Sequence, residues 1–523
     1  MAAHSPTTPA TRWTNFGWVD DLNDIAEVWR EGEQQGITES KIRVRRQPLP
    51  EDCGLFSDGG ILETGACVLA VDSLRMAQPA PVHSFRYSGK DLFCENVSLR
   101  ALAQKHGTPL YVYSQATLSD HFNKLDQALA PVPHLVCFAM KSNSNLGVIR
   151  TLAGLGSGFD TVSAGEIQRV IAAGGDPRRC VFAGVGKTEE EIAFGLRNDI
   201  YSFNVESEAE LRRISRVALK LKKIAPVAVR VNPNIDAGTH AKITTGTYAN
   251  KFGIAFEEIE GVYARAARLP NLRLRGLQMH IGSQLTDVTP FRKAVEKVVP
   301  LVERLNRKHG FDFFSIGGGI GIVYNPALAS GAPAWWRTPA GRKVLTPERY
   351  AATLIPLLKP LGLKILLEPG RFITGNAGVL LTRVEFIKKT GRKNFVIVDA
   401  AMNDLIRPAF YDSYHEIVPL VKKSGATISS DVVGPICESG DYFAKDRPLP
   451  KLGEGDFLAL LSAGAYGAVM GSTYNSRPLA AEILVNGSRS AVVRQRQPVE
   501  EIWRHEQRAP WQGKGRSRGK SGR

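Results

Sequence analysis

Residues 135–163 read LVCFAMKSNSNLGVIRTLAGLGSGFDTVS. The stretch begins with a short apolar run, continues through a polar turn and a segment of helical periodicity, and ends in a second short apolar run. Two strands joined by a helix of this length predict a βαβ unit, in which the strands run parallel. We therefore take this unit as the element from which the fold is built.

The same pattern recurs six more times along the next 200 residues. Eight units at this spacing predict a (β/α)8 TIM barrel, of class α/β, rather than an open sheet. The polar residues that follow the runs would then meet at the C-terminal face of the barrel, where active sites lie. The further runs are CVFAGVG near Gly184, IYSFNVES near Glu206, PVAVRVN at Asn232, LRGLQMHIGS near His280, FFSIGGG at Gly319 and KILLEPGR at Glu368. The residues expected at the strand ends are therefore Lys141, Ser163, Glu206, Asn232, His280, 317–319 and Glu368.

After about residue 375 the pattern changes to strand-like runs separated by Gly, Pro and Asp, such as VLLTRVEFI and FLALLSAG. This sequence pattern predicts a C-terminal antiparallel β-domain. The run LYVYS, which precedes the barrel, is expected to add a strand to that domain. The expected parts are a poorly ordered N-terminal extension at 1–84 with one short amphipathic helix near 22–29, the barrel at 115–374, a β-rich domain formed by 85–114 plus 375–500, and a basic disordered tail at 501–523.

Composition excludes several classes of protein. The chain has 523 residues, 43% of them hydrophobic and 23% charged, as in an ordinary globular protein. No apolar run reaches the roughly 18 residues of a membrane helix, and no signal-peptide pattern follows Met1. Six cysteines without a C-x-x-C pair indicate neither a disulfide framework nor a zinc site. We expect a cytoplasmic protein without a membrane partner.

The net charge of +16 raises the question of a nucleic-acid partner. Residues 504–523 hold seven Lys or Arg against one Glu and are rich in Gly and Ser, which is the composition of a disordered tail. No basic stripe interleaved with aromatic residues occurs elsewhere. The charge therefore indicates a solvated surface or attraction of anionic substrates, and a weak nucleic-acid role of the tail is the alternative.

Lys141 ends the first apolar run and is followed by Ser-Asn. A lysine at the end of a buried strand is costly unless its charge is paired, its pKa is shifted or its amine is used covalently. One interpretation is a surface lysine whose ammonium reaches solvent. The other is a Schiff-base lysine, because desolvation favours the neutral, nucleophilic amine.

Glu368 begins the sequence Glu-Pro-Gly-Arg directly after the eighth run. An acid before Pro-Gly is compatible with a simple turn. At the open end of a barrel, the same carboxylate is placed to pair with a protonated ring nitrogen, and Arg371 with nearby backbone amides is placed to hold a phosphate.

A glycine run at 317–319 follows the seventh strand. It does not fit G-x-G-x-x-G, because Ile322 stands where the third glycine would be. The run is either a tight turn or a backbone that approaches a phosphate. His280, with Ser283 three residues later, is either a core histidine or a ring that stacks on a flat cofactor. No second His or Cys lies at ligand spacing, so no metal site is predicted.

Cys437 and Glu438 lie in the sequence VGPICESGD of the β-rich part. A cysteine is more often an inert small hydrophobe, but the neighbouring carboxylates of Glu438 and Asp441 make this an unusual setting. Two turn-rich stretches nearby are dense in tyrosine and arginine, which indicates that the second domain also carries polar function. These stretches contain Arg407, Tyr411, Tyr466, Tyr474, Asn475 and Arg477.

Taken in order, FAMKSN, GFDTVSAGE, HIGSQ, the glycine run, EPGR, GPICES and GAYG resemble the pyridoxal-phosphate decarboxylases that have an alanine-racemase-like barrel. The resemblance covers about 85–493. It implies a homodimeric carboxy-lyase with shared active sites and pyridoxal 5'-phosphate as its cofactor. Departures from the family pattern are small: Ser142 stands where alanine is usual, and Ala401 where glycine is common.

The resemblance also implies a role for individual residues. Lys141 would hold the cofactor, Glu368 would pair with its pyridine nitrogen and His280 would stack on its ring. Cys437 would donate a proton to the substrate carbon, acting across the dimer interface. The other cofactor positions are Ser283, Gly319, Pro369, Gly370, Arg371 and Tyr466, and the substrate positions are Arg371, Arg407, Tyr411, Glu438 and Tyr466.

Within this family, the resemblance is to the branch that converts meso-2,6-diaminopimelate to L-lysine and carbon dioxide, the last step of lysine biosynthesis. This substrate carries an ammonium and a carboxylate at each end, and Arg407 and Glu438 are suited to its non-reacting end. A decarboxylase of ornithine, arginine or carboxynorspermidine is the alternative enzyme, although related ornithine enzymes typically read Cys-Asp at this position. A non-catalytic binding barrel is the alternative of another class, but such a protein should have lost Lys141 or Cys437.

Overall fold

The structure, a computed structural model, describes residues 81–235 and 251–512. The chain divides into two units, Met1–Ala77 and Gln78–Arg523, and the described residues belong to the second. The expected helix near 22–29, most of the expected N-terminal extension and the tail from 513 onward lie outside the described residues. Residues 503–512 follow the short 3-10 helix η9 (Val499–Ile502) without a further helix or strand.

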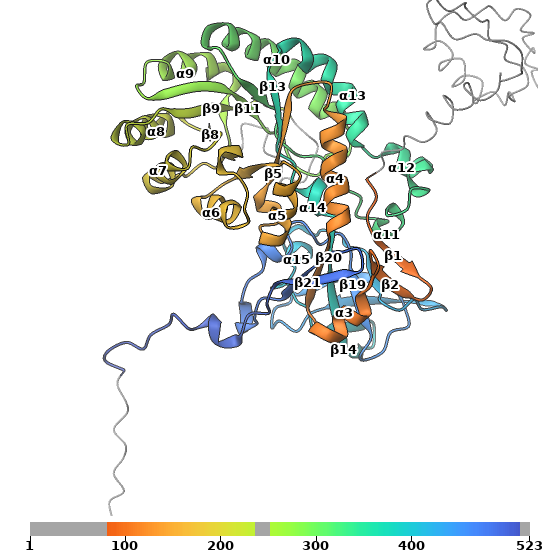
Figure 1. Ribbon diagram of the computed structural model, residues 1–523. Helices are drawn as coiled ribbons and strands as arrows, with labels where there is room; N and C mark the ends of the chain where they lie inside the picture. Colours follow the sequence, from red (N-terminus) through yellow and green to blue (C-terminus); the bar gives the residue numbers. More distant parts are fainter. Residues whose placement is uncertain (1–80, 236–250, 513–523) are drawn as a thin grey trace, which may run out of the picture. The chain divides into compact units, whose positions relative to one another are not determined.

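Eight parallel strands close into a barrel in the described part of the chain (Figure 1). The ring is continuous because β13 (Lys364–Leu367) pairs with β5 (His134–Ala139), and β8 (Ser202–Val205) pairs with β9 (Ala225–Asn232). All eight apolar runs form these strands, which confirms the predicted TIM barrel. The strands are β5 (His134–Ala139), β6 (Gly158–Thr161), β7 (Cys180–Phe182), β8 (Ser202–Val205), β9 (Ala225–Asn232), β11 (Leu272–Met279), β12 (Phe313–Ser315) and β13 (Lys364–Leu367), with the short β10 (Ile254–Ala255) added to β9.

Helices follow the strands and cover the outside of the barrel (Figure 1). They are amphipathic, so each buries an apolar stripe against the sheet. They are α4 (Gln115–Ala128), α5 (Leu146–Gly154), α6 (Ala164–Ala172), α7 (Glu189–Arg197), α8 (Glu208–Lys220), α9 (Ile259–Ala266), α10 (Thr289–His309) and α13 (Pro347–Leu358).

Polar residues just beyond the strands start several of these helices. The Ser163 hydroxyl accepts the Glu166 N–H at 3.2 Å and caps α6. Thr188 and Glu191 form a reciprocal capping box at the start of α7, and the Ser207 hydroxyl caps α8. Ser163, expected from its strand-end position to lie with the functional residues, is therefore a helix cap.

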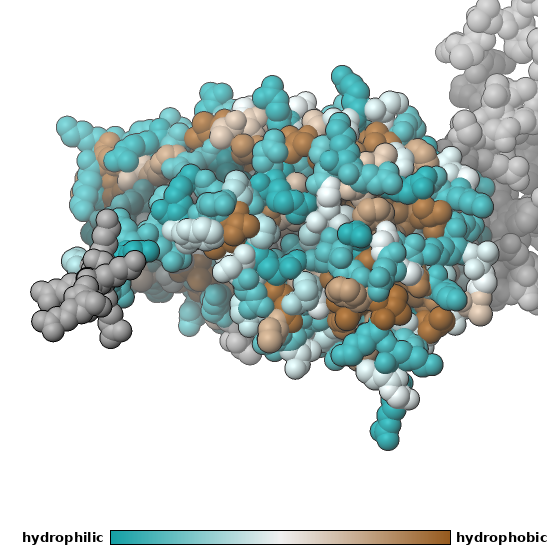
Figure 2. Space-filling view, turned by 90° about the horizontal axis from the view of Figure 1, so that it is seen from below, coloured by the Kyte–Doolittle hydropathy of each residue, from teal (hydrophilic) through white to brown (hydrophobic). Residues whose placement is uncertain are grey.

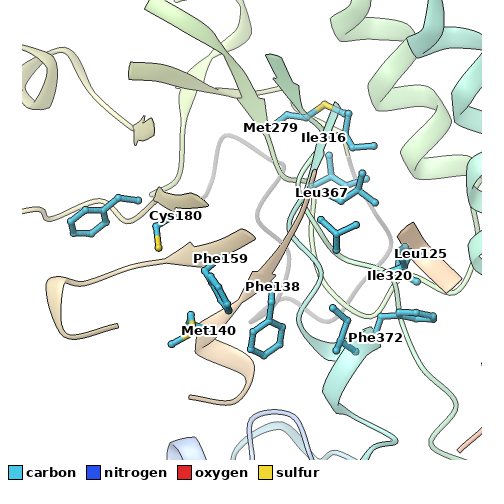
Figure 3. Packing of buried hydrophobic residues seen from close by; sticks show 14 of the residues in the cluster. Leu125, Phe138, Met140, Phe159, Cys180, Met279, Ile316, Ile320, Leu367 and Phe372 are labelled. Atoms are coloured by element: carbon cyan, nitrogen blue, oxygen red, sulfur yellow. The ribbon is translucent and has the colours of Figure 1, made fainter. Parts of the chain in front are cut away.

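The space between barrel and helices is filled by large apolar side chains. Phe138 of β5 and Phe159 of β6 are register partners and are fully buried. Figure 3 shows both rings in this core, with Met140 nearby. Burying one such side chain contributes roughly 1.5–3 kcal/mol to stability. The core fixes the strand ends, and the strand ends carry the side chains of the site.

The second domain is built around β14 (Gly378–Lys389), which pairs with three strands. One of them is β4 (Leu110–Ser114), formed by the LYVYS run as expected. Most pairs are antiparallel, as predicted, but β4 with β20 (Ala481–Asn486) and β15 (Asn394–Val398) with β17 (Thr427–Val433) run parallel. Long connections separate both of these pairs, so no hairpin imposes the antiparallel direction. The other strands are β15 (Asn394–Val398), β16 (Ile417–Pro419), β17 (Thr427–Val433), β18 (Tyr442–Pro450), β19 (Phe457–Leu460), β20 (Ala481–Asn486) and β21 (Arg489–Arg494).

The remaining elements are short. A three-stranded antiparallel sheet precedes the barrel, and one small helix, α14 (Arg371–Thr374), lies between the last barrel strand and β14. Within 81–235 and 251–512, every helix is too short or too polar to span a bilayer. The face in Figure 2 is mostly hydrophilic, with smaller hydrophobic areas between polar side chains. The short elements are β1 (Phe85–Ser88), β2 (Asp91–Cys94), β3 (Val97–Ser98), α3 (Leu99–His106), α11 (Ala327–Ser330), α12 (Pro339–Lys343), α14 (Arg371–Thr374) and α15 (Arg407–Tyr411).

Candidate active site

A cavity of about 400 Å³ lies at the C-terminal ends of the barrel strands, where both domains contribute to its wall. Polar and charged side chains converge on this wall, which is typical of a ligand-binding site. The lining residues are Ala139, Lys141, Asp160, Arg230, Phe252, His280, Ser283, Gln284, Gly319, Ile320, Tyr324, Glu368, Gly370, Arg371, Arg407, Tyr411, Ser413, Tyr414 and Tyr466.

The structure brings together ten of the residues singled out in the sequence. Pro369 lies between two lining residues without lining the cavity itself, and Cys437 and Glu438 do not line the cavity of their own chain. Glu206, directly after β8, and Asn232, the last residue of β9, support loops beside it. The ten are Lys141, His280, Ser283, Gly319, Glu368, Gly370, Arg371, Arg407, Tyr411 and Tyr466.

Lys141 lies in the short 3-10 helix η2 (Met140–Ser142) at the end of β5, and its Nζ is 3.7 Å from Oδ2 of the buried Asp160. Desolvation opposes the charged amine, but Asp160 together with Tyr466 and Glu368 outweighs this effect, so the pKa of Lys141 is raised. Desolvation acts as expected, toward the neutral amine, but the neighbouring acidic groups reverse the net shift. Asp160 holds the amine in place as an ammonium.

Glu368 follows β13 and is surrounded by neutral hydrogen-bond donors. Its Oε1 accepts from the Ser315 hydroxyl at 2.7 Å and from Nδ2 of Asn204 at 3.3 Å, and its Oε2 accepts from Nε2 of Gln278 at 2.8 Å. Burial, followed by the negative charge of Asp160, raises the pKa of Glu368. A cation placed against this carboxylate would relieve that cost.

His280 follows β11, and its Nδ1 accepts the backbone N–H of Gly318 at 3.2 Å. Burial, together with the positive charges of Arg230 and Lys141, lowers the pKa of His280 well below its usual value. The imidazole is therefore neutral, and it is fixed against the glycine run. A flat, neutral ring on the cavity wall is suited to covering another ring.

The glycine run is needed for close packing of the chain. A Cβ at Gly318 would lie 2.1 Å from the carbonyl oxygen of Glu368, and a Cβ at Gly319 would lie 2.5 Å from that of Gly282. Gly319 also has a φ of 118°, which side chains disfavour. These glycines thus let three strand-end loops meet at one point, where backbone N–H groups border the cavity.

Arg371, at the start of α14, crosses the same region. Its Nε and Nη2 donate to the Ser283 hydroxyl at 3.4 and 3.3 Å, and its guanidinium lies 4.9 Å from the centre of the Tyr466 ring. Tyr466 has a left-handed φ of 56° and donates its N–H to the Ser142 carbonyl at 2.7 Å. A strained backbone of this kind persists where the surroundings fix it, often at functional sites.

Arg407 comes from the β-rich domain and is buried. Its Nη1 donates to Nε2 of His415 at 2.9 Å, and Nδ1 of His415 lies 2.8 Å from the Leu461 carbonyl. Since that carbonyl can only accept, Nδ1 carries the proton and His415 is neutral. The guanidinium also donates to the Ser413 hydroxyl at 3.2 Å. Within the described residues, Arg407 forms no ion pair with a carboxylate.

A buried chain of charges stands behind the cavity. Lys187 Nζ lies 2.6 Å from Oε1 of Glu210, and Oε2 of Glu210 accepts the N–H of Glu206 at 2.9 Å. Glu206 in turn accepts from Nη1 of Arg230 at 3.1 Å. Each of the two carboxylates has one cation as its partner, so the four charges balance, and Arg230 lines the cavity.

Cys437 lies in an exposed loop of the β-rich domain. Its N–H donates to Oδ1 of Asn475 at 3.0 Å. Asp441 anchors the loop by accepting the N–H groups of Met402 and Ile436, both at 2.7 Å. The loop is thus a fixed structure, and its thiol is open to a neighbouring molecule.

Sequence reasoning missed five residues that define the site. Four are polar side chains inside apolar strands, where a buried position needs a polar partner. A polar residue within each of the apolar runs GFDT, SFNV, VAVRVN and LQM could have indicated them, but only the residues at the strand ends were considered. Tyr324, beyond the glycine run, has no comparable signal. The five are Asp160, Asn204, Arg230, Gln278 and Tyr324.

Comparison with known proteins agrees with this geometry. The family described as "Pyridoxal-dependent decarboxylase, pyridoxal binding domain" matches residues 115–375. The diaminopimelate decarboxylase of Vibrio cholerae is 48% identical over 415 residues, which cover 79% of this chain and 95% of that protein. That of Pseudomonas aeruginosa is 49% identical over 431 residues, covering 82% and 99%. This chain belongs to the diaminopimelate decarboxylase family.

Solved structures agree with the family assignment. The crystal structure of diaminopimelate decarboxylase from Helicobacter pylori complexed with L-lysine is 39% identical, has a TM-score of 0.72, and covers 78% of this chain and 98% of its own. The crystal structure of AQ1208 from Aquifex aeolicus is 43% identical with a TM-score of 0.73, covering 81% and 97%. The fold of the family therefore extends over both described domains.

The donor set of the cavity fits pyridoxal 5'-phosphate, the cofactor of the family. Three buried oxygens, Oδ1 of Asp160, Oδ1 of Asn204 and Oε1 of Gln278, have no hydrogen-bond partner among the described residues. All three lie close around Glu368 or Lys141, where a ring nitrogen with its proton and an attached amine would supply donors. At the other end of the cavity, Arg371, Ser283 and the glycine run suit a phosphate.

Proposed function

We propose that this enzyme decarboxylates meso-2,6-diaminopimelate to L-lysine and carbon dioxide. The observation that carries the proposal is Arg407, a buried guanidinium on the cavity wall that neutral partners hold and no described carboxylate pairs. A buried cation without a counter-charge is costly unless a ligand supplies one. A substrate with a second carboxylate, at its non-reacting end, does so. Ornithine has no such group.

Lys141 would hold the cofactor covalently, with Glu368 at its ring nitrogen and His280 against its ring. When bound, pyridoxal phosphate supplies an electron-accepting ring for the electron pair that the departing carboxylate leaves behind. The phosphate would be held by Ser283, Gly319, Gly370, Arg371 and Tyr466.

Side chains of the protein would stabilise the charges, orient the substrate and transfer the proton. Glu368, ionised against a cationic nitrogen, would keep that nitrogen protonated, and Asp160 would receive the Lys141 ammonium when the amine is released. Arg407, Tyr411 and Arg371 would orient the substrate. The Cys437 thiol would give its proton to the carbon that lost the carboxylate, and would recover one from solvent.

Cys437 and Glu438 would act in the cavity of a partner subunit, so the active enzyme would be a homodimer. Their position outside their own chain's cavity supports this arrangement. Glu438 would bind the ammonium at the non-reacting end of the substrate. The cofactor-binding part would be 115–374 and the β-rich part 85–114 with 375–500, and the enzyme would act in the cytoplasm.

The test is an absorbance spectrum of the purified holoenzyme before and after addition of meso-diaminopimelate, with lysine and carbon dioxide assayed in the same tube. We expect a yellow cofactor band that changes on addition, with lysine formed. A band that responds to ornithine but not to diaminopimelate would reject the substrate. A protein that stays colourless after incubation with pyridoxal phosphate would reject the role of Lys141.

A further inference from the structure

Tyr324 lies in the cavity wall between two arginines. Nη1 of Arg371 donates to the Tyr324 hydroxyl at 2.6 Å, and the guanidinium of Arg407 lies 4.9 Å from the centre of its ring. Arg371 belongs to the phosphate end of the cavity, and Arg407 comes from the other domain. The Tyr324 side chain therefore contacts both arginines, one at each end of the cavity.

The loop that carries Tyr324 is held firmly. Gln284 donates to the Ile322 carbonyl at 2.7 Å and accepts the Ile322 N–H at 3.2 Å. Nδ2 of Asn376 donates to the Val323 carbonyl at 3.0 Å. The Tyr324 ring also packs edge to face on His415, 5.5 Å away at 84°. These contacts preorganise the hydroxyl, so its position costs little when a ligand binds.

The hydroxyl has a proton to give. A guanidinium has donors and no acceptor, so Arg371 and Arg407 can only donate to the phenol oxygen. Within the described residues, the Tyr324 hydroxyl donates no hydrogen bond to another protein group. Burial opposes ionisation of the phenol, but the two guanidiniums outweigh it and lower the pKa of Tyr324. Such polarisation makes the O–H a stronger donor toward an anion.

We propose that the Tyr324 hydroxyl, together with Arg407, binds the carboxylate at the non-reacting end of the substrate and so determines specificity for amino acids that carry it. The inference rests on the proposed function, since it deepens the recognition of the same substrate. A carboxylate has two oxygens, and an arginine and a phenol on adjacent walls can each donate to one. An amine that lacks this carboxylate gains nothing from the hydroxyl.

The test compares binding of two probes to the holoenzyme, followed by the absorbance of the bound cofactor. L-Lysine keeps the carboxylate of the non-reacting end, and cadaverine lacks it. Tyr324→Phe keeps the ring packing and removes only the hydroxyl. We expect it to weaken L-lysine binding by about 10- to 100-fold while cadaverine binding changes less than about twofold. With meso-diaminopimelate, KM should rise by a similar factor and kcat should stay near the wild-type value.

Tyr350→Phe is the matched control, because Tyr350 is buried against Phe291 in the barrel helices, outside the cavity. It should leave both affinities unchanged. Equal weakening of both probes by Tyr324→Phe, or no effect on L-lysine, would overturn the inference and leave the proposed function intact. A wild-type enzyme that binds cadaverine as tightly as L-lysine would overturn both, because no site for the second carboxylate would then exist.

Discussion

The Ser315 hydroxyl donates a hydrogen bond of 2.7 Å to Oε1 of Glu368. Gln278 and Asn204 complete a shell of neutral donors around the same carboxylate. Neutral donors fix the position of a carboxylate without cancelling its charge, and burial raises its pKa. The site is thus built to bring a negative charge against a cation that arrives with a ligand.

Replacement of that charge should impair the chemistry and preserve the fold. Glu368→Gln keeps the size of the side chain but cannot stabilise a cationic ring nitrogen, so we expect kcat to fall about 100-fold and the cofactor absorbance to change. Ser315→Ala removes one of three donors and should cost about tenfold or less. Steady-state kinetics and absorbance spectra of both variants check this, and a Glu368→Gln enzyme with kcat within twofold of wild type would contradict it.

His83 makes the stability of the protein depend on pH. Its Nε2 lies 2.7 Å from the Ala327 carbonyl and its Nδ1 accepts the N–H of Phe85 at 3.3 Å, so the ring is held neutral. Burial lowers the pKa of His83 from 6.5 to about 4. As the pH falls from 6.5 toward 4, the unfolded chain takes up a proton that the folded chain does not, and stability is lost at about 1.4 kcal/mol per pH unit.

Urea unfolding between pH 4.5 and 7.5 measures this loss. Other buried groups titrate in the same range, so the readout is the difference between wild type and His83→Gln. We expect the variant to lose stability less steeply on acidification, because it no longer binds the extra proton when unfolded. His505→Gln, at an exposed histidine, should match the wild-type slope. Parallel slopes for wild type and His83→Gln would show that His83 takes no part.

The barrel could be predicted from the sequence because its signal is local. The apolar runs form buried parallel strands, and most of the barrel helices begin at a polar cap, so period and spacing are enough. The residues at the strand ends could be found for the same reason. Lys141, His280 and Glu368 line the cavity because barrel geometry places strand ends together.

Partnerships inside the site could not be predicted. The ion pair of Lys141 with Asp160 joins two strands, and the position of Tyr324 between Arg371 and Arg407 joins two domains. Such contacts depend on three-dimensional placement, which no period in the chain encodes. The same holds for the two parallel strand pairs of the second domain, since their partners come from distant segments.

The buried chain of charges behind the cavity should matter for stability. The Lys187 ammonium is fully buried and lies 2.6 Å from Glu210. Lys187→Met would leave Glu210 buried without its counter-charge, and we expect the free energy of unfolding to fall by about 3–5 kcal/mol. Urea unfolding measures the change, and the double variant Lys187→Met with Glu210→Leu should recover much of it.

An exposed ion pair supplies the control for Lys187. Lys220 lies 3.3 Å from Glu189, and its side chain is 70% exposed. Lys220→Met should change the free energy of unfolding by less than about 0.5 kcal/mol, because solvent already screens the pair. A Lys187→Met variant as stable as the Lys220→Met variant would mean that the buried pair adds no stability.

Mixing two inactive variants should restore activity if Cys437 serves the partner's cavity. Lys141→Ala and Cys437→Ala each lack a group, but a mixed dimer has one site with both Lys141 and Cys437 intact. Random pairing makes half of the dimers mixed, so we expect about a quarter of wild-type activity after subunit exchange. Lys141→Ala mixed with Glu368→Gln is the control: both residues line the cavity of one chain, so neither site of the mixed dimer is complete. Recovery in the first mixture and none in the second, measured as lysine formed, is the expected result, whereas no recovery in either would place Cys437 in its own chain's site or outside the chemistry.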